Sequence, residues 1–206
     1  MAEEERVCSY DRLGEGGSGE PGDRQSVADT HGLLTAVLDR VAGDREVVPA
    51  GHSLGGLIAA RYAPDHPDRV AGLVLLDATP PSMTADLTGV VPEAATGPGA
   101  EVRAQNLAVF GGENPERVVV EDGPVRPAGD VPTEVVRHGV PYLGEIPEYG
   151  AELERAWAEG QERWPAVSTD SRLRTAEGAG HHIHVDRPAI AADAVGDVVD
   201  RVAGRA

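Results

Sequence analysis

The segment Gly51-His52-Ser53-Leu54-Gly55 is the part of this sequence whose residue types and spacing most clearly suggest chemistry. It follows a short apolar run, Val47 to Ala50, and opens a segment, Leu57 to Ala63, that is typical of a helix. A serine at a sharp strand-to-helix turn can act as a nucleophile, because the strained turn projects its hydroxyl above the sheet. Glycines two residues before and after the serine remove the bulk that would obstruct this turn. The next backbone N–H, that of Leu54, would point at a developing oxyanion near the positive end of the helix.

Three further segments accompany the serine motif, one before it and two after it, of which the first ends in an acid and the second carries a histidine. They are Arg6 to Ser18, which reads as a strand and a glycine-rich loop, Asp68 to Asp77, an apolar strand ending in an acid, and Gly178 to His181, followed by Asp186-Arg187-Pro188. Together with the serine motif they resemble the α/β-hydrolase family over most of the chain. In this resemblance Arg6 to Tyr10 is the fourth strand, and Val70 to Leu76 forms the sixth.

The resemblance implies an α/β fold, with a mainly parallel sheet flanked by helices and an irregular cap insertion. The alternation of strand-like and helix-like segments favours the same class. Residues 1–79 are expected to form a hydrolase core with the nucleophile turn, and residues 131–206 its C-terminal part with the catalytic histidine. Residues 80–130 are expected to form the cap or insertion, in which only Ala100 to Phe110 looks helical.

Three helices are predicted outside the insertion. Ser26 is a suitable N-cap for a helix that reaches about Val41, and Pro188 is a suitable first residue for the last helix. A third helix is expected from Ala151 to about Trp164, with Trp157 and Trp164 packed in the core.

The resemblance also implies the roles of the site residues. Ser53 is the expected nucleophile, His181 the expected base, and the N–H of Leu54 the expected oxyanion donor. Asp77 is the preferred acid, because it ends an apolar strand and matches a position that some family members use. Most members take the acid after the next strand, expected here at Val131 to His138, where the nearest carboxylates are Glu145 and Glu148.

The sequence offers less support for two other kinds of site. His181, His182 and His184 could form a metal site, but neither cysteines nor an H-E-x-x-H spacing supports zinc, so no metal and no cofactor are expected. His182 and His184 are then expected to be structural or to support the base.

A dinucleotide site is the other alternative, because three glycines follow a strand with an acid about twenty residues on. These residues are Gly14, Gly16, Gly19 and Asp39. Pro21 and Gly22 prevent a helix from starting at the third glycine, so no helix N-terminus could hold a pyrophosphate.

Composition limits the classes of partner. The 206 residues carry a net charge of −17, and all 18 basic residues are arginine. This charge argues against nucleic acid or an anionic membrane as a partner. The substrate that the family resemblance implies is a small ester-like molecule. Met1 to Arg6 shows no signal peptide, and no apolar run approaches the ~20 residues of a membrane span. The single Cys8 is expected in a buried strand and excludes an internal disulfide. From these observations together, a cytoplasmic protein is expected.

The chain begins where the family's fourth strand begins, so strands one to three and the loop with the second oxyanion donor are expected to be missing. Arg6 to Tyr10 must then pair directly with the strand before Ser53, stay unpaired, or be completed by another polypeptide. We therefore expect an N-terminally truncated serine esterase. The alternative is a non-catalytic remnant or small-molecule-binding protein without a full oxyanion hole.

Overall fold

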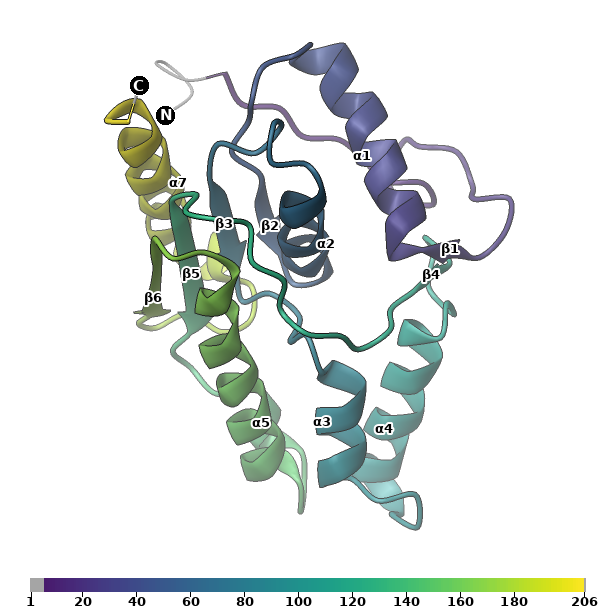
Figure 1. Ribbon diagram of the computed structural model, residues 1–206. Coiled ribbons are helices and arrows are strands. Elements are labelled where there is room, and N and C mark those ends of the chain that lie inside the picture. The colour runs from purple at the N-terminus through teal and green to yellow at the C-terminus, as the bar shows by residue number, and fades with distance from the viewer. Residues whose placement is uncertain (1–5, 206) are drawn as a thin grey trace.

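The central sheet has four parallel strands in the order β2-β3-β5-β6 (Figure 1). The computed structural model describes residues 6–205. The strands are β2 (Ala50–His52), β3 (Leu73–Leu76), β5 (Thr133–His138) and β6 (Ser171–Ala176). Parallel pairing brings the carboxyl ends of all four strands to one edge, where open α/β sheets bind their ligands. The predicted α/β class with a mainly parallel sheet is confirmed.

Helices cover both faces of this sheet, which explains why β3 is apolar throughout and completely buried. Leu73 and Leu75 pack in one cluster with α2 (Leu54–Tyr62), whereas Val74 and Leu76 pack in another with α7 (Pro188–Ala203). Alternate side chains of one strand therefore tie the helix after Ser53 and the C-terminal helix to the same backbone.

The first helix, α1 (Val27–Val41), confirms the prediction from Ser26. The Ser26 hydroxyl accepts a hydrogen bond from the backbone N–H of Asp29, and the Asp29 carboxylate accepts one from the N–H of Ser26. This reciprocal capping box satisfies two backbone donors that the helix start would otherwise leave unpaired. The adjoining β1 (Gln25–Ser26) pairs in parallel with β4 (Val118–Val119).

Residues 80–130 contain more helix than the sequence indicates. Beside the expected helix, α4 (Gly97–Phe110), they form α3 (Met83–Val90), which packs against α5 (Gly150–Arg163) through Leu87 and Leu153. These three helices lie together beyond the carboxyl ends of β3 and β5 (Figure 1). The shorter helices are α6 (Ile183–Asp186) and the 3-10 turns η1 (Ala63–Asp65), η2 (Leu143–Glu145) and η3 (Trp164–Val167).

The prediction of a strand at Arg6 to Tyr10 is wrong. Within residues 6–205, β2 pairs only with β3, and Arg6 to Tyr10 forms an exposed segment outside both sheets. A strand needs a partner for its backbone groups, and this segment finds none in the described part of the chain. Cys8 is consequently exposed and not buried. Residues 1–5, where no signal peptide was expected, lie outside the described residues.

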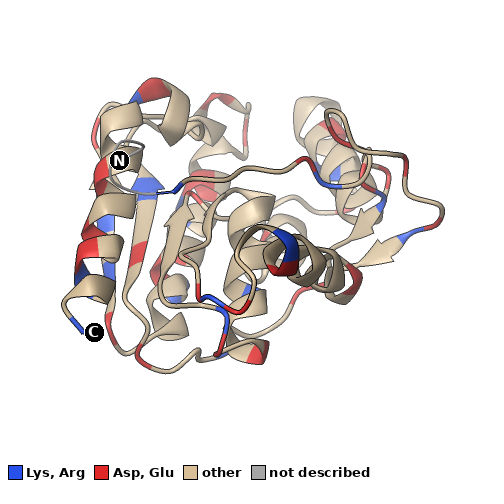
Figure 2. Cartoon of the chain, turned by 90° about the horizontal axis from the view of Figure 1, so that it is seen from above, with Lys and Arg blue, Asp and Glu red and all other residues tan. Residues whose placement is uncertain are grey.

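Acidic residues are spread over the helices and loops of the fold, with arginines among them (Figure 2). Several arginines form ion pairs between elements, as Arg201 does with Glu134 and Asp170. Among residues 6–205, no helix is long and apolar enough to cross a bilayer.

Candidate active site

Ser53 occupies the sharp turn between β2 and α2. Its φ of 50° and ψ of −121° place it in a conformation that residues with a side chain rarely adopt. Two backbone hydrogen bonds hold it there: its N–H donates to the carbonyl of Leu76 at 3.1 Å, and its carbonyl accepts from Thr79 at 3.0 Å. Strained backbone of this kind persists only where neighbours fix it and is concentrated at functional sites.

The glycines around Ser53 differ in how much space surrounds them for a side chain. A Cβ on Gly51 would lie 2.4 Å from the backbone of Gly55, so no side chain fits at position 51. A Cβ on Gly55 would meet only the Arg12 guanidinium tip at 3.5 Å, which is ordinary contact. The tight position on the helix side is Gly56, where a Cβ would lie 2.6 Å from the Ala78 side chain. Glycine is therefore required at position 51, as expected. On the helix side it is required at position 56 and not, as expected, at position 55.

Asp77 and His181 are joined by a hydrogen bond, although they lie far apart in the sequence. Nδ1 of His181 donates to Oδ2 of Asp77 at 2.7 Å. Asp77 directly follows β3, has a positive φ of 43°, and is completely buried. His181 follows the turn after β6, so the parallel sheet itself brings the two residues to one edge.

The Asp77 carboxylate has other donors as well. The indole Nε1 of Trp157 donates to it at 3.1 Å, and Nδ1 of His138 lies 2.9 Å from Oδ1. Burial alone would raise the pKa of Asp77, but the hydrogen bonds from His138 and His181 outweigh it and lower that pKa to about 2. Asp77 is therefore a carboxylate at neutral pH, and His181 must carry its proton on Nδ1, which leaves the lone pair on Nε2.

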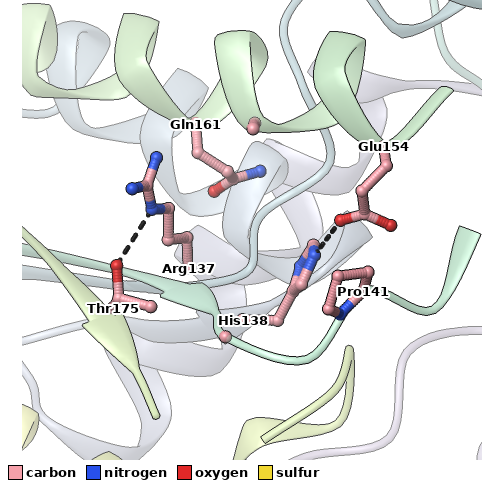
Figure 3. A pocket seen from close by; sticks show the side chains of 8 residues that line it. Arg137, His138, Pro141, Glu154, Gln161 and Thr175 are labelled. Carbon is pink, nitrogen blue, oxygen red and sulfur yellow. Dashed lines mark hydrogen bonds and ion pairs between the residues drawn. The ribbon is translucent and has the colours of Figure 1, made fainter. Parts of the chain in front are cut away.

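His138 and Glu154 are site residues that the sequence reasoning missed. His138 ends β5, is buried, and its Nε2 contacts the carboxylate of Glu154 on α5 (Figure 3). Burial acts to lower the pKa of His138, but the hydrogen bonds and charges of Asp77 and Glu154 raise it overall. With a carboxylate on each ring nitrogen, the imidazolium form is favoured. Beside this pair lies a cavity of about 220 Å³, which Arg137 and Gln161 also line (Figure 3).

A larger cavity of about 430 Å³ contains both Ser53 and His181 in its wall. Most of the remaining wall is apolar and comes from α3, α4 and α5, with Leu87, Phe110 and Leu153 as examples. Trp157 also lines it and meets the His181 ring edge to face, at 5.4 Å between ring centroids. Trp157 was expected only to pack in the core, as Trp164 does; its indole also holds Asp77.

The Ser53 hydroxyl faces Thr79 Oγ1 at 3.4 Å. Among residues 6–205 it makes no hydrogen bond with His181. Catalytic hydrogen bonds are often long or absent without a substrate, so the shared cavity is the stronger geometric observation.

Known proteins share this fold. The sequence profile of the alpha/beta hydrolase fold matches residues 2–94. An esterase from Thermogutta terrifontis superposes with a TM-score of 0.61 at 20% identity, over 93% of this chain and 78% of the esterase. The chain has the α/β-hydrolase fold.

Curated relatives match shorter segments. A non-heme chloroperoxidase of Streptomyces lividans is 42% identical over 79 residues, which cover 38% of this chain and 28% of that protein. The lipase LipV of Mycobacterium tuberculosis is 54% identical over 44 residues, which cover 21% of this chain and 16% of the lipase. The chain thus matches less than a third of the length of these hydrolase-fold relatives.

Glu145 and Glu148, the alternative acids, are less favourably placed than Asp77 to orient His181. Glu145 ends the 3-10 turn η2, Glu148 follows it, and both side chains are exposed. Neither forms a hydrogen bond or ion pair with His181 in the described part of the chain. Leu54 is the first residue of α2, so the helix supplies no acceptor for its N–H.

The third histidine beside the site is His52, which directly precedes Ser53 at the end of β2. Its Nε2 donates to the carbonyl of His181 at 2.8 Å. Burial and the nearby His181 lower the pKa of His52 to about 4, so its ring is neutral near pH 7. The structure also brings His182 and His184 next to it, with ring centroids 5.2 and 4.8 Å away.

Proposed function

We propose that this chain is a serine hydrolase that cleaves a carboxylic ester or a related acyl bond. The observation that carries the proposal is the hydrogen bond from His181 to the buried Asp77, at the wall of the cavity that also holds Ser53. A nucleophile, a base and a group that orients the base are the three parts that such a reaction needs.

In the proposed reaction, Oγ of Ser53 attacks the carbonyl carbon while Nε2 of His181 accepts the hydroxyl proton. The Leu54 N–H stabilises the oxyanion that forms. The His181 imidazolium, stabilised by Asp77, then returns the proton to the leaving alcohol, and an acyl-enzyme results. Water, deprotonated by His181, then attacks the acyl carbon, the bond to Oγ breaks, and the His181 imidazolium returns the proton to Oγ, which releases the acid and free Ser53.

The attack requires the Ser53 side chain to turn from Thr79 toward His181. This is a rotation about one side-chain bond, and the serine backbone is already fixed by Leu76 and Thr79. Substrate binding in the cavity would favour this rotamer by excluding water from the space between the two side chains.

The cavity supports a substrate with a small or medium apolar acyl or alkyl group. Its volume of about 430 Å³ falls within the usual range for small-molecule sites, and its wall is mainly apolar. We propose that residues 80–130 act as the cap, because α3 and α4 supply much of this wall. Residues 1–79 and 131–206 would then form the hydrolase core.

A binding protein without turnover is the second candidate. The observation that favours it is the edge of β2, which pairs only with β3 within residues 6–205. The described residues thus place no neighbouring strand there whose following loop could give a second oxyanion donor. Removal of one such donor costs about 10²–10³ in rate in a measured protease.

Hydrolysis of p-nitrophenyl acetate by the chain and by its Ser53→Ala variant tests the proposal. We expect hydrolysis above background that the substitution abolishes, with both proteins folded by circular dichroism. Equal background rates in two folded proteins would instead favour the binding protein, and retained activity in the variant would remove Ser53 from the mechanism.

A further inference from the structure

Three histidines from two distant segments meet at the edge of the proposed active site. One ring nitrogen each of His52, His181 and His182 lies within 4.8 Å of the other two. His52 ends β2, and the other two follow the turn after β6. The sequence showed only His181, His182 and His184 as neighbours, and their spacing did not indicate a metal site.

The hydrogen bonds of the cluster determine which nitrogens can bind a cation. Nδ1 of His181 donates to Asp77, so Nε2 is free. Asp77 therefore orients this imidazole as carboxylates orient the histidine ligands of many zinc sites. Nε2 of His52 donates to a carbonyl, so the neutral ring has its lone pair on Nδ1. His182 is exposed and its side chain is free to adjust.

The donor set determines the class of ion. Imidazole nitrogens suit zinc and its neighbours in the first transition row, whereas calcium and magnesium require oxygen ligands. In a tetrahedral zinc site with bonds of about 2.1 Å, the ligand nitrogens lie roughly 3.4 Å apart. The nitrogens lie within 4.8 Å of one another, so they have to approach by up to about 1.4 Å. Rotation of the exposed His182 can supply its share of this movement. The fourth position is open to water or to His184.

We propose that His52, His181 and His182 bind a divalent transition-metal ion, with zinc as the representative, and that this ion occupies Nε2 of His181. The ion takes the lone pair that would accept the Ser53 proton, so the metal-bound form cannot activate Ser53. No electron is transferred, and a neutral ring loses no proton on binding. The metal site itself does not depend on the proposed hydrolase function; only the inhibition rests on it.

Isothermal titration of zinc chloride into the untagged, metal-free chain tests the site directly. We expect one zinc ion per chain. The His182→Ala and His52→Ala variants should each bind at least about tenfold more weakly, because even the loss of an outer-shell partner costs about 10–100-fold. The matched control is His66→Gln, which removes an imidazole at the opposite end of α2, and it should bind zinc as the unsubstituted chain does.

Absence of saturable binding, or equal affinity in all four proteins, would overturn the proposal. Because His182 is exposed, its variant keeps the test decisive even if His52→Ala does not fold. Zinc should also inhibit p-nitrophenyl acetate hydrolysis with a midpoint that matches the titrated affinity, measured against each variant's own zinc-free rate. If the chain binds zinc but hydrolyses no ester, the metal site is supported and the proposed hydrolase function is contradicted.

Discussion

His138 holds the Asp77 carboxylate through both its backbone and its ring. The N–H of His138 donates to Oδ1 at 3.2 Å, and its Nδ1 lies 2.9 Å from the same oxygen. Asp77 therefore faces one histidine at the end of β5 and a second, His181, toward the cavity. Because His138 also contacts Glu154, a buried charge network lies behind the proposed catalytic pair.

Replacement of Asp77 by asparagine is expected to reduce kcat by about 10⁴, the loss seen when the triad aspartate of a serine protease is changed in this way. An amide can donate to the His181 ring and favour the wrong tautomer, and it cannot stabilise the imidazolium. The measurement is steady-state ester hydrolysis. Asp68→Asn, an exposed aspartate before β3, is the control and should keep its rate; an equal loss in both variants would contradict the role of Asp77.

Replacement of Glu154 by glutamine tests the network behind Asp77. We expect the free energy of unfolding to fall by about 1–3 kcal/mol, because a buried charge-assisted hydrogen bond to His138 is lost. Urea unfolding measures this change, and kcat should fall more than KM changes because Asp77 is less firmly held. Glu152→Gln, on the exposed side of the same helix, should stay within about 0.5 kcal/mol. Identical curves for the two variants would show that Glu154 does not stabilise the network.

The two glycines that flank Ser53 should respond differently to alanine. Gly51→Ala places a Cβ against the backbone of Gly55 and should cost about 1–3 kcal/mol of stability, together with ester hydrolysis. Gly55→Ala meets only a flexible arginine tip and should be neutral or slightly stabilising. Thermal unfolding of both variants is the measurement, and a larger loss at position 55 would contradict the packing described for the turn.

The patterns that predicted structure correctly were local ones. The capping residue Ser26, the apolar strand before Asp77 and the first helical residue Pro188 each determine an element from neighbouring residues alone. The turn at Ser53 belongs to the same group, because Gly51 has a direct steric cause, although the need for glycine expected at position 55 is found at position 56.

The features that were missed depend on tertiary contacts. The strand β6 carries Arg172 and Arg174 and lies at the edge of the sheet, so its sequence shows no apolar run. The helix α3 has little apolar periodicity of its own and is stabilised by packing on α5. Arg6 to Tyr10 looks like a strand but has no partner within the described residues. The contact between His138 and Glu154 joins two elements, and no spacing in the sequence indicates it.

His31 should make stability depend on pH. Burial, and then the charge of His66, lower the pKa of His31 below its ordinary 6.5, while Asp65 acts to raise it and Arg61 to lower it. The folded state therefore disfavours the charged ring. Stability should be complete above about pH 6.5 and should fall as the pH drops from there through the lower folded-state pKa.

Urea unfolding between pH 7.5 and 5 checks this expectation. Other groups titrate in the same range, so the comparison is with His31→Phe, which keeps a ring beside Tyr62. The loss of stability toward acid should be smaller in the variant. Parallel pH dependence in the two proteins would show that His31 does not contribute.

Labelling with a fluorophosphonate tests whether His181 and Asp77 activate Ser53. The adduct would be counted by intact mass and located by peptide mapping. We predict one adduct per chain, on Ser53, with none in Ser53→Ala and much slower labelling in folded His181→Ala. No adduct on the folded chain, an adduct on another residue, or an unchanged rate without His181 would contradict the account.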